Sequence, residues 1–367
     1  MGNWLSSACY SDETASLLND SEETSTGLVG NHELELKTPH GFKNLGNTCY
    51  LSAVVVALAQ LPEFVYELHG YVDWWNNEAT DIRTSKAKEI QIKLISELLR
   101  LLCEIRETAQ APSAKRLFQL TSRLNPNFSN YTQQDAHEFL SIIIEAAEAF
   151  CDLHDRVEGR DQTNSRLFNG FPMRYEAQTT VRCEECGTKT KLKENCIGMS
   201  VEMEGKDLAG WSIWNSLYRV ERLTDENQFY CGNCAKNVNA TKTTRPVSLP
   251  NIFVIHYKLF QVDFNSNDTV KLSKIYPAPF PPLQISLNEM VDPKTRSHFK
   301  GYSLKSMVIH QGSVLDRGHY ICAHPTTNNF SKWRLYDDDD CEDVQLDELQ
   351  YNNGHSTPYL IFYQKEL

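Results

Sequence analysis

The chain has 367 residues, of which 41% are hydrophobic and 23% are charged, the composition of an ordinary soluble globular protein. Its net charge is −12 and it has no long basic block, so nucleic acid is not an expected partner. No apolar run is long enough to cross a membrane, and no secretion leader opens the chain. An odd count of eleven cysteines without a leader indicates a reducing compartment, the cytoplasm or the nucleus.

Residues 1–38 are rich in Ser, Thr, Asp, Glu and Asn, and they predict a disordered acidic tail. The tail begins MGNWLSSAC, so removal of Met1 would leave Gly2 at the head of a G-x-x-x-S pattern, which is the signal for N-myristoylation. A chance match is the alternative. One acyl chain binds membranes only marginally, and an acidic tail cannot supply a polybasic second signal. We therefore expect palmitoylation of Cys9 as the second anchor, giving a peripheral association with a membrane.

The segment Gly41–Gln60, GFKNLGNTCYLSAVVVALAQ, places a cysteine where a turn rich in Gly and Asn meets an apolar run of helical length. A thiol at a helix N-terminus faces unpaired N–H groups and the positive end of the helix dipole, and both favour the thiolate. Asn47 or Thr48 could cap this helix, and Asn44 could aim its amide at an oxyanion formed at Cys49. The alternative is a buried structural cysteine at the head of a core helix.

Apolar residues at helical spacing predict a mostly helical first half. Pro62 should end the first helix, and Thr132 should cap the last. The expected helices cover residues 49 to about 61, 86–107, 111–127 and 132–150.

After about Phe168 the chain changes to short β-rich runs separated by turn residues, which predicts a largely antiparallel sheet system. Residues 261–296 are polar and rich in proline, and we expect a loop with one strand there. The fold class is therefore predicted to be α+β. The expected strands are 175–182, 189–193, 197–202, 252–259, 304–311, 320–324 and 359–363.

Four cysteines form two knuckles, Cys183-x-x-Cys186 and Cys231-x-x-Cys234, separated by an insert. This spacing is typical of a tetrahedral four-thiolate zinc site, which is closed and therefore structural. Four free cysteines or two disulfides are the alternatives, and a reducing compartment disfavours disulfides. We expect one structural Zn²⁺ per chain.

Two further motifs near the C-terminus supply the partners that a cysteine nucleophile needs. Residues 316–320 read DRGHY and residues 333–340 read WRLYDDDD. The nucleophile requires a base, and the base requires an orienting carboxylate or amide, which must be near in space rather than in sequence. His319, beside Gly318, is the candidate base, and the aspartates at 337–340 would otherwise be a solvated acidic loop.

Taken together, NLGNTCY, QQDAHEFL, the two CxxC pairs, RGHY, WRLYDD and the closing PYLIFY resemble the catalytic domain of ubiquitin-specific proteases. The resemblance runs from about Gly41 to Tyr363, with the motifs in the family's order. It implies a papain-like α+β hand within a catalytic domain at 39–367. The hand would have a helical thumb at about 41–165, β fingers carrying a zinc ribbon at about 166–250, and a β palm at about 251–365.

The resemblance also implies roles for the residues around the thiol. Cys49 would be the nucleophile and His319 the base. Asp337 would orient the imidazole, and Asp338 would lie near the oxyanion. Asn44 and the backbone N–H of Cys49 would hold that oxyanion.

Three more residues correspond to the channel that takes the extended C-terminal tail of ubiquitin in this family. Asp135 would meet a basic side chain of the tail, and Gln133 would meet its backbone. Tyr320 would pack over it. The chain departs from the usual pattern at Ser52, where the family has Asn, and at Leu259, where it has a basic residue. We expect these departures to affect packing and substrate affinity rather than chemistry.

These roles predict a cysteine protease that hydrolyses the isopeptide bond after the C-terminal glycine of ubiquitin on lysine side chains, through a thioester. The expected partners are ubiquitin and ubiquitinated proteins, with an activating adaptor protein as a further candidate. Two alternatives stay open. One is an inactive or weakly active ubiquitin-binding module, and the other is a protease for a different ubiquitin-like modifier.

Overall fold

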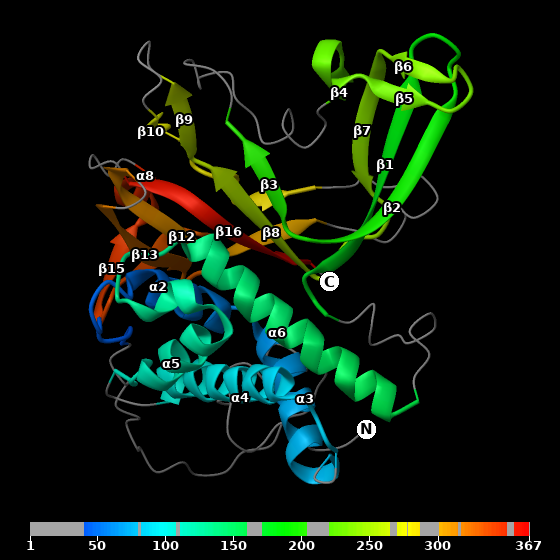
Figure 1. The fold of residues 1–367 in the computed structure, drawn as a ribbon. Coiled ribbons are helices and arrows are strands. Elements are labelled where there is room, and N and C mark those ends of the chain that lie inside the picture. Colours follow the sequence, from blue (N-terminus) through cyan, green and yellow to red (C-terminus); the bar gives the residue numbers. More distant parts are fainter. Residues whose placement is uncertain are drawn as a thin grey trace, which may run out of the picture.

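The computed structural model describes residues 40–366 except for 80–81, 108–110, 160–170, 204–219, 265–269, 277, 287–300, 315–316 and 351–355. The predicted tail of residues 1–38, with Gly2 and Cys9, lies outside the described residues. Figure 1 shows helices gathered on one side of the molecule, a large sheet beside them, and a smaller sheet that projects away from both. The predicted α+β class is confirmed.

The helical region, which we call the thumb, matches the predicted helices closely at α4 and differs from them elsewhere. The helix predicted at 111–127 covers only 115–124, because Asn125, which precedes Pro126, is extended and a 3₁₀ turn follows it. A helix that was not predicted, α3, begins at Pro62, which occupies the first helical position, where a missing N–H costs nothing. Proline therefore ends one helix and starts another. The thumb contains α2 (Cys49–Ala59), α3 (Pro62–Glu78), α4 (Lys86–Glu107), α5 (Lys115–Leu124), the 3₁₀ turn η1 (Pro126–Ser129) and α6 (Ala136–Val157).

The start of α6 corrects the predicted cap. The helix begins at Ala136 and not at Thr132, because Asp135 is the residue that caps it. The Asp135 Oδ1 atom accepts hydrogen bonds from the backbone N–H groups of His137 (2.6 Å) and Glu138 (3.0 Å). An ionised carboxylate at this position satisfies two otherwise unpaired donors and also complements the helix dipole.

Helix α2 is the centre of the core. All eleven of its residues are buried, as expected for a helix that is apolar on every side. It packs against α4 and α6 of the thumb and against β12 (Tyr302–Val314) and β13 (Arg317–Pro325) of the large sheet. A buried hydrogen bond from Ser306 Oγ on β12 to the Ala57 carbonyl (2.9 Å) joins the sheet to this helix. The residue that begins α2, Cys49, is therefore placed at the junction of the two regions.

The large sheet, which we call the palm, has the strand order β15-β14-β13-β12-β16-β8-β3, with β11 paired to β12. Its pairings are antiparallel except for the parallel pair β3–β8. A short helix, α8 (Leu346–Gln350), follows β15. The strands are β3 (Met199–Glu202), β8 (Ile252–Lys258), β11 (Gln284–Ile285), β12 (Tyr302–Val314), β13 (Arg317–Pro325), β14 (Lys332–Asp337), β15 (Asp340–Gln345) and β16 (Thr357–Lys365).

The projecting sheet, which we call the fingers, has the order β2-β1-β7-β4 and carries the β5–β6 hairpin. The strand predicted at 197–202 is present from Met199 as β3, but its predicted start is wrong, because Gly198, with φ of +66°, separates β2 from β3. A Cβ there would lie 2.9 Å from the Val254 carbonyl oxygen, so the close approach also requires glycine. The strands are β1 (Arg174–Cys183), β2 (Lys189–Ile197), β4 (Val220–Leu223), β5 (Phe229–Cys231), β6 (Lys236–Val238) and β7 (Ala240–Pro246).

The segment predicted as loop with one strand contains instead the antiparallel hairpin of β9 (Phe260–Phe264) and β10 (Val270–Lys274), followed by β11. Its strands are short and partly polar, so their composition resembles that of a loop. Within the described residues no single helix is long and apolar enough to span a membrane, and α2 and α3 reach that length only as a pair bent by 94°.

Candidate active site

Cys49 is the first residue of α2 and only 3% of its surface is exposed. The turn before it uses positive φ angles at Gly46 (+107°) and Asn47 (+53°). The predicted side-chain cap is wrong, because Thr48 is the residue before the helix but bonds to it only through its backbone carbonyl, which accepts from the Leu51 and Ser52 N–H groups (both 3.1 Å). Its Oγ1 accepts from the Leu45 N–H (2.9 Å), and Asn47 Nδ2 donates to the Tyr131 carbonyl (2.8 Å). Both side chains therefore stabilise the turn, and the helix begins without a side-chain cap.

Asn44 is held in place at both ends of its amide. Its Oδ1 accepts from the backbone N–H of Gly46 (2.9 Å) and of Thr48 (3.2 Å). Its Nδ2 donates to Asp338 Oδ2 at 2.9 Å. Burial raises the pKa of the Asp338 carboxyl, and the hydrogen bond from Asn44 opposes that shift. The structure therefore brings Asn44 and Asp338 together beside the turn that leads to Cys49.

His319 lies on β13 between the thiol and the aspartates. Its Nε2 is 2.5 Å from Asp337 Oδ1, at the end of β14, and 4.0 Å from Asp338 Oδ2. A hydrogen bond with the Cys49 side chain, followed by the one with Asp337, raises the pKa of His319 to about 9 against the opposing effect of burial. Because Nε2 faces Asp337, Nδ1 is the ring nitrogen that remains for the thiol. The protonated ring next to a thiol favours a thiolate–imidazolium pair.

The three predicted tail-binding residues already have partners within the chain. Gln133 forms two hydrogen bonds with the backbone of Gly318, from Nε2 to the carbonyl (2.6 Å) and from the Gly318 N–H to Oε1 (2.7 Å). Asp135 caps α6 and accepts a 2.5 Å hydrogen bond from the Tyr359 hydroxyl. Tyr320 is 4% exposed and its ring packs beside that of Tyr359. These residues lie at the contact between thumb and palm. In the sequence, Gln133 and Asp135 directly precede α6, and Tyr320 directly follows His319.

Two residues of this neighbourhood were not singled out from the sequence. Tyr359 joins the palm to Asp135, and His310 is fully buried beneath Gly318, with both ring nitrogens unpaired among the described residues. A Cβ on Gly318 would lie 2.1 Å from His310 Nε2. Burial, with nearby Lys274 and His319, lowers the pKa of His310 to about 3, so this ring is neutral. The only signal in the sequence was a histidine inside an otherwise apolar strand, a pattern that usually means packing.

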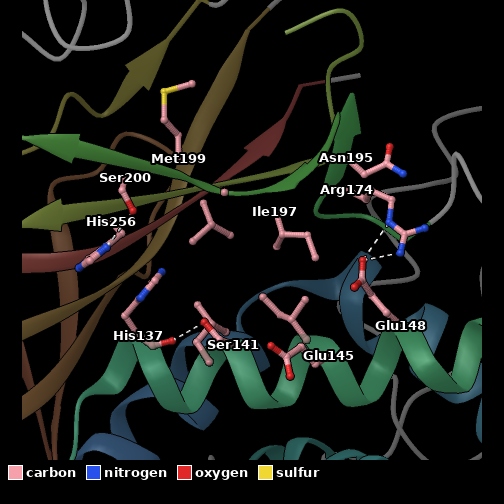
Figure 2. A pocket seen from close by; sticks show the side chains of 14 residues that line it. His137, Ser141, Glu145, Glu148, Arg174, Asn195, Ile197, Met199, Ser200 and His256 are labelled. Atoms are coloured by element: carbon pink, nitrogen blue, oxygen red, sulfur yellow. Dashed lines mark hydrogen bonds and ion pairs between the residues drawn. The ribbon is translucent and has the colours of Figure 1, made fainter. Parts of the chain in front are cut away.

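A cavity of about 460 Å³ lies away from the thiol, between α6 and strands of the fingers and palm. Figure 2 shows His137 of α6 facing His256 of β8 at one end, and the Glu148–Arg174 ion pair at the other. The two imidazoles stack with centroids 4.0 Å apart. Burial lowers the pKa of both rings, that of His256 to about 3, so the stacked pair is neutral. The lining of the cavity includes none of the residues gathered around the thiol.

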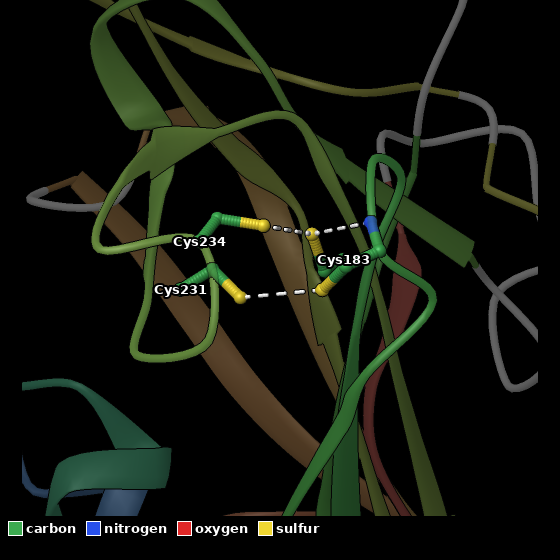
Figure 3. Close-up of side chains that lie close together, drawn as sticks. Cys183, Cys231 and Cys234 are labelled. Atoms are coloured by element: carbon green, nitrogen blue, oxygen red, sulfur yellow. Dashed lines mark hydrogen bonds between the residues drawn. The ribbon is translucent and has the colours of Figure 1, made fainter.

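The four cysteines of the fingertip fit a zinc ion. The Sγ atoms of all four lie within 4.8 Å of one another (Figure 3). The Cys183–Cys234 and Cys186–Cys231 sulfur pairs are 3.9 and 3.6 Å apart. A tetrahedral zinc with 2.3 Å bonds to sulfur requires a separation of about 3.8 Å. All four are free cysteines, so the two-disulfide alternative does not describe this arrangement.

Comparisons with known proteins agree with this geometry. The family model described as ubiquitin carboxyl-terminal hydrolase matches residues 40–363. Ubiquitin carboxyl-terminal hydrolase 12 of Salmo salar is 27% identical over 88% of this chain and 89% of its own length. Ubiquitin carboxyl-terminal hydrolase 4 of Arabidopsis thaliana is 26% identical over 87% of this chain and 89% of its own length.

Solved structures share the fold at lower identity. The Ubp8/Sgf11/Sus1/Sgf73 deubiquitinase module of SAGA bound to monoubiquitin matches with a TM-score of 0.65 and 19% identity, over 89% of this chain and 69% of the other. The same module bound to ubiquitin aldehyde matches with a TM-score of 0.66 and 19% identity, over 93% and 72%. The family match covers nearly all of the described chain and includes the thiol, the imidazole and the carboxylates gathered at one site. The chain therefore belongs to the ubiquitin carboxyl-terminal hydrolase family and is a deubiquitinating cysteine protease.

Proposed function

We propose that Cys49, His319 and Asp337 carry out the hydrolysis. The observation that supports this is the position of one imidazole between the thiol and a carboxylate, with its pKa raised to about 9. The Cys49 thiolate attacks the carbonyl carbon of the C-terminal glycine of the modifier. His319 gives its proton to the departing lysine amine, and the acyl group stays on sulfur as a thioester. His319 then takes a proton from water, which attacks the thioester and releases the free carboxylate and the thiol.

Asn44 and the Cys49 backbone N–H are proposed to stabilise the oxyanion. Asn44 Nδ2 carries two hydrogens, and one of them is used by Asp338, which leaves the second for the developing charge. The contact with Asp338 removes rotational freedom from the amide before substrate arrives. Donors fixed in advance stabilise a transition state more than donors that must reorient.

Ubiquitin, joined to lysine side chains, is the proposed substrate. The family and both relatives carry ubiquitin in their names, and the two structural neighbours were solved with ubiquitin or ubiquitin aldehyde bound. The test uses a panel of modifiers with an electrophile in place of the terminal carboxylate, one built on ubiquitin and others on its relatives. Covalent labelling of Cys49 by the ubiquitin probe alone is expected. Labelling only by another modifier, or tight binding of ubiquitin without any adduct, would contradict the proposal.

The four fingertip cysteines are proposed to hold one structural Zn²⁺. Cys183 and Cys231 are buried with Val238, and this small cluster is the described core of the fingertip. A metal bound by all four thiolates has no open position, so its chemistry would be confined to holding the two knuckles together.

Further proposals concern the partners, the location and the acylation of the protein in the cell. We infer association with an adaptor protein, which is supported by structural neighbours that contain Sgf11, Sus1 and Sgf73. We infer a cytoplasmic or nuclear location from cysteine usage.

Acylation at Gly2 and Cys9, with peripheral membrane association, is proposed from the N-terminal sequence alone. Fractionation of wild type, Gly2→Ala and Cys9→Ser from cells fed a labelled fatty acid tests it. Unlabelled, fully soluble wild-type protein would contradict it.

A further inference from the structure

The end of β12 near the active site extends beyond its neighbour β16. The first residue of β16, Thr357, pairs with His310, and β12 continues past this point. The pairing of β12 with β13 becomes irregular just after Gln311, which lies opposite His319, and Gly312 adopts a φ of +109°. Such a bulge bends a strand and changes the aim of the side chains around it. The catalytic histidine is therefore paired to the start of an irregular segment that β16 does not support.

Lys274, the last residue of β10, supports this segment instead. Its Nζ donates hydrogen bonds to the carbonyl oxygens of His310 (2.8 Å) and Gly312 (2.9 Å), the two residues on either side of Gln311. The lysine backbone is itself fixed, because Lys274 pairs with Phe260 in the β9–β10 hairpin. The Lys274 amino group thus holds the backbone on both sides of Gln311, the residue that pairs with His319. While Lys274 is protonated, these hydrogen bonds are roughly twice as strong as neutral ones.

A lysine in this position is costly, which argues that the contact matters. The side chain is partly buried, and burial lowers the pKa of Lys274 to about 7. An apolar side chain of similar length would avoid this desolvation, but it would remove a donor from both carbonyls, of which that of His310 also accepts from Thr357 Oγ1 (3.2 Å).

We propose that Lys274 is a positioning residue for the catalytic base: by holding the His310 and Gly312 carbonyls it fixes Gln311, and through the strand pairing it fixes the backbone of His319. The other side of the same backbone is held by the two hydrogen bonds between Gln133 and Gly318. The imidazole is then kept within reach of Cys49 by contacts from both regions. This inference rests on the proposed role of His319 as the general base.

The test compares Lys274→Met with Lys258→Met, which removes an exposed lysine paired with Glu202 on the palm surface. The measurements are kcat and KM on ubiquitin carrying a C-terminal aminocoumarin, and the rate of Cys49 alkylation by iodoacetamide across pH. In Lys274→Met we expect kcat to fall about 10-fold or more, because a small misplacement of reacting groups is costly. KM should stay within about twofold, and alkylation near neutral pH should slow because less thiolate is paired. Lys258→Met should behave as wild type.

Lys274→Arg, which keeps the charge and the donors, should recover part of kcat. An unchanged kcat and alkylation profile in folded Lys274→Met would overturn the inference, and so would a loss confined to KM. If Lys274→Met does not fold, Lys274→Gln, which keeps a shorter N–H donor, carries the same comparison. His319→Ala separates the two proposals. Wild-type turnover in that variant would defeat the proposed function, whereas an inactive His319→Ala beside a fully active Lys274→Met would defeat only the inference.

Discussion

Asn44 donates a 2.9 Å hydrogen bond to Asp338, which lies 294 positions further along the chain. The contact joins the turn before the nucleophile to the loop that follows Asp337. A second contact supports it, since the Phe42 N–H donates to the Asp338 carbonyl at 2.8 Å. Gly41 is required there, because a Cβ would lie only 1.8 Å from that carbonyl oxygen. The two halves of the catalytic machinery are thus fixed to one another by polar contacts outside the proposed triad.

Replacing Asn44 should damage turnover more than binding. In Asn44→Ala we expect kcat to fall by roughly 10² to 10³, the usual effect of losing one oxyanion donor, with little change in KM. Steady-state kinetics on ubiquitin aminocoumarin measure both. Asn77→Ala, which removes an exposed amide on α3 that bonds only its own helix, is the matched control. A wild-type kcat in Asn44→Ala would refute the oxyanion assignment.

The two aspartates next to His319 should differ in their effects. Asp337 Oδ1 lies 2.5 Å from His319 Nε2, whereas Asp338 Oδ2 lies 4.0 Å from it. Asp337→Ala should therefore lower kcat more than Asp338→Ala. The loss should stay below the roughly 10⁴ seen when the orienting carboxylate of a serine protease is replaced. Equal residual rates, or the reverse order, would show that Asp338 is the residue that orients the imidazole.

The raised pKa of His319 predicts the alkaline limit of activity. With a pKa of about 9 the imidazolium persists well above the ordinary value of 6.5 and is lost above about pH 9. We therefore expect kcat/KM to fall as pH rises through about 9. The stabilisation that accompanies this shift is complete below pH 6.5 and is lost as pH rises through 9.

The cause of the shift can be tested separately. The hydrogen bond with Cys49 is its largest cause, so Cys49→Ala should lower the His319 titration midpoint measured by NMR. Alanine at position 49 removes the sulfur atom and with it this hydrogen bond. A midpoint that stays near pH 9 in Cys49→Ala would mean that Asp337 alone raises the pKa.

The sequence predicted those elements whose apolar residues or metal ligands recur at a regular spacing within one short segment. The range of α4, the burial of α2 and the two cysteine knuckles are of this kind. Pro62 correctly indicated the end of α2. It did not indicate the start of α3, although proline is equally suited to the first position of a helix. The β9–β10 hairpin was missed because short polar strands draw their stability from β12 rather than from their own composition.

Contacts between segments far apart in the chain could not be predicted from the sequence. Asp135 and Gln133 could be placed near a channel, but their bonds to Tyr359 and Gly318 depend on how thumb and palm meet. Asp135 rather than Thr132 caps α6, and the Thr132 hydroxyl donates instead to Asn130 Oδ1 (2.7 Å). Pairwise packing of this sort has no period in the sequence to reveal it.

Zinc should be separable from catalysis. Purified protein is expected to contain one zinc per chain, and Cys231→Ser should lose it and lower the melting temperature by roughly 5 °C or more, since metal binding contributes to folding. The thiolate–imidazolium pair should survive, so a small electrophile should still alkylate Cys49 at neutral pH. Metal analysis by mass spectrometry and a thermal melt give both readings. Protein purified without chelators and free of zinc would contradict the assignment.

Close packing in the active site should make Gly318 intolerant of even a methyl group. A Cβ at this position would lie 2.1 Å from His310 Nε2 and 2.7 Å from the Gln311 carbonyl oxygen. In Gly318→Ala we expect β13 to move away from β12 and to carry His319 with it. The result should be a loss of kcat of about 10² and a destabilisation of about 1–3 kcal/mol from overpacking.

Two further variants make this prediction specific. Gly70→Ala is the matched control, because a Cβ on Gly70 meets nothing within 4 Å and the residue lies inside α3. It should leave kcat unchanged and raise stability slightly, by about 0.5–1 kcal/mol. Adding His310→Ala to Gly318→Ala should restore part of the activity, because the ring is the nearer obstacle, but not all of it, because the Gln311 carbonyl remains. Kinetics and thermal melts of the three variants decide the matter. Full activity in Gly318→Ala would show that the strand absorbs the methyl group without moving the base.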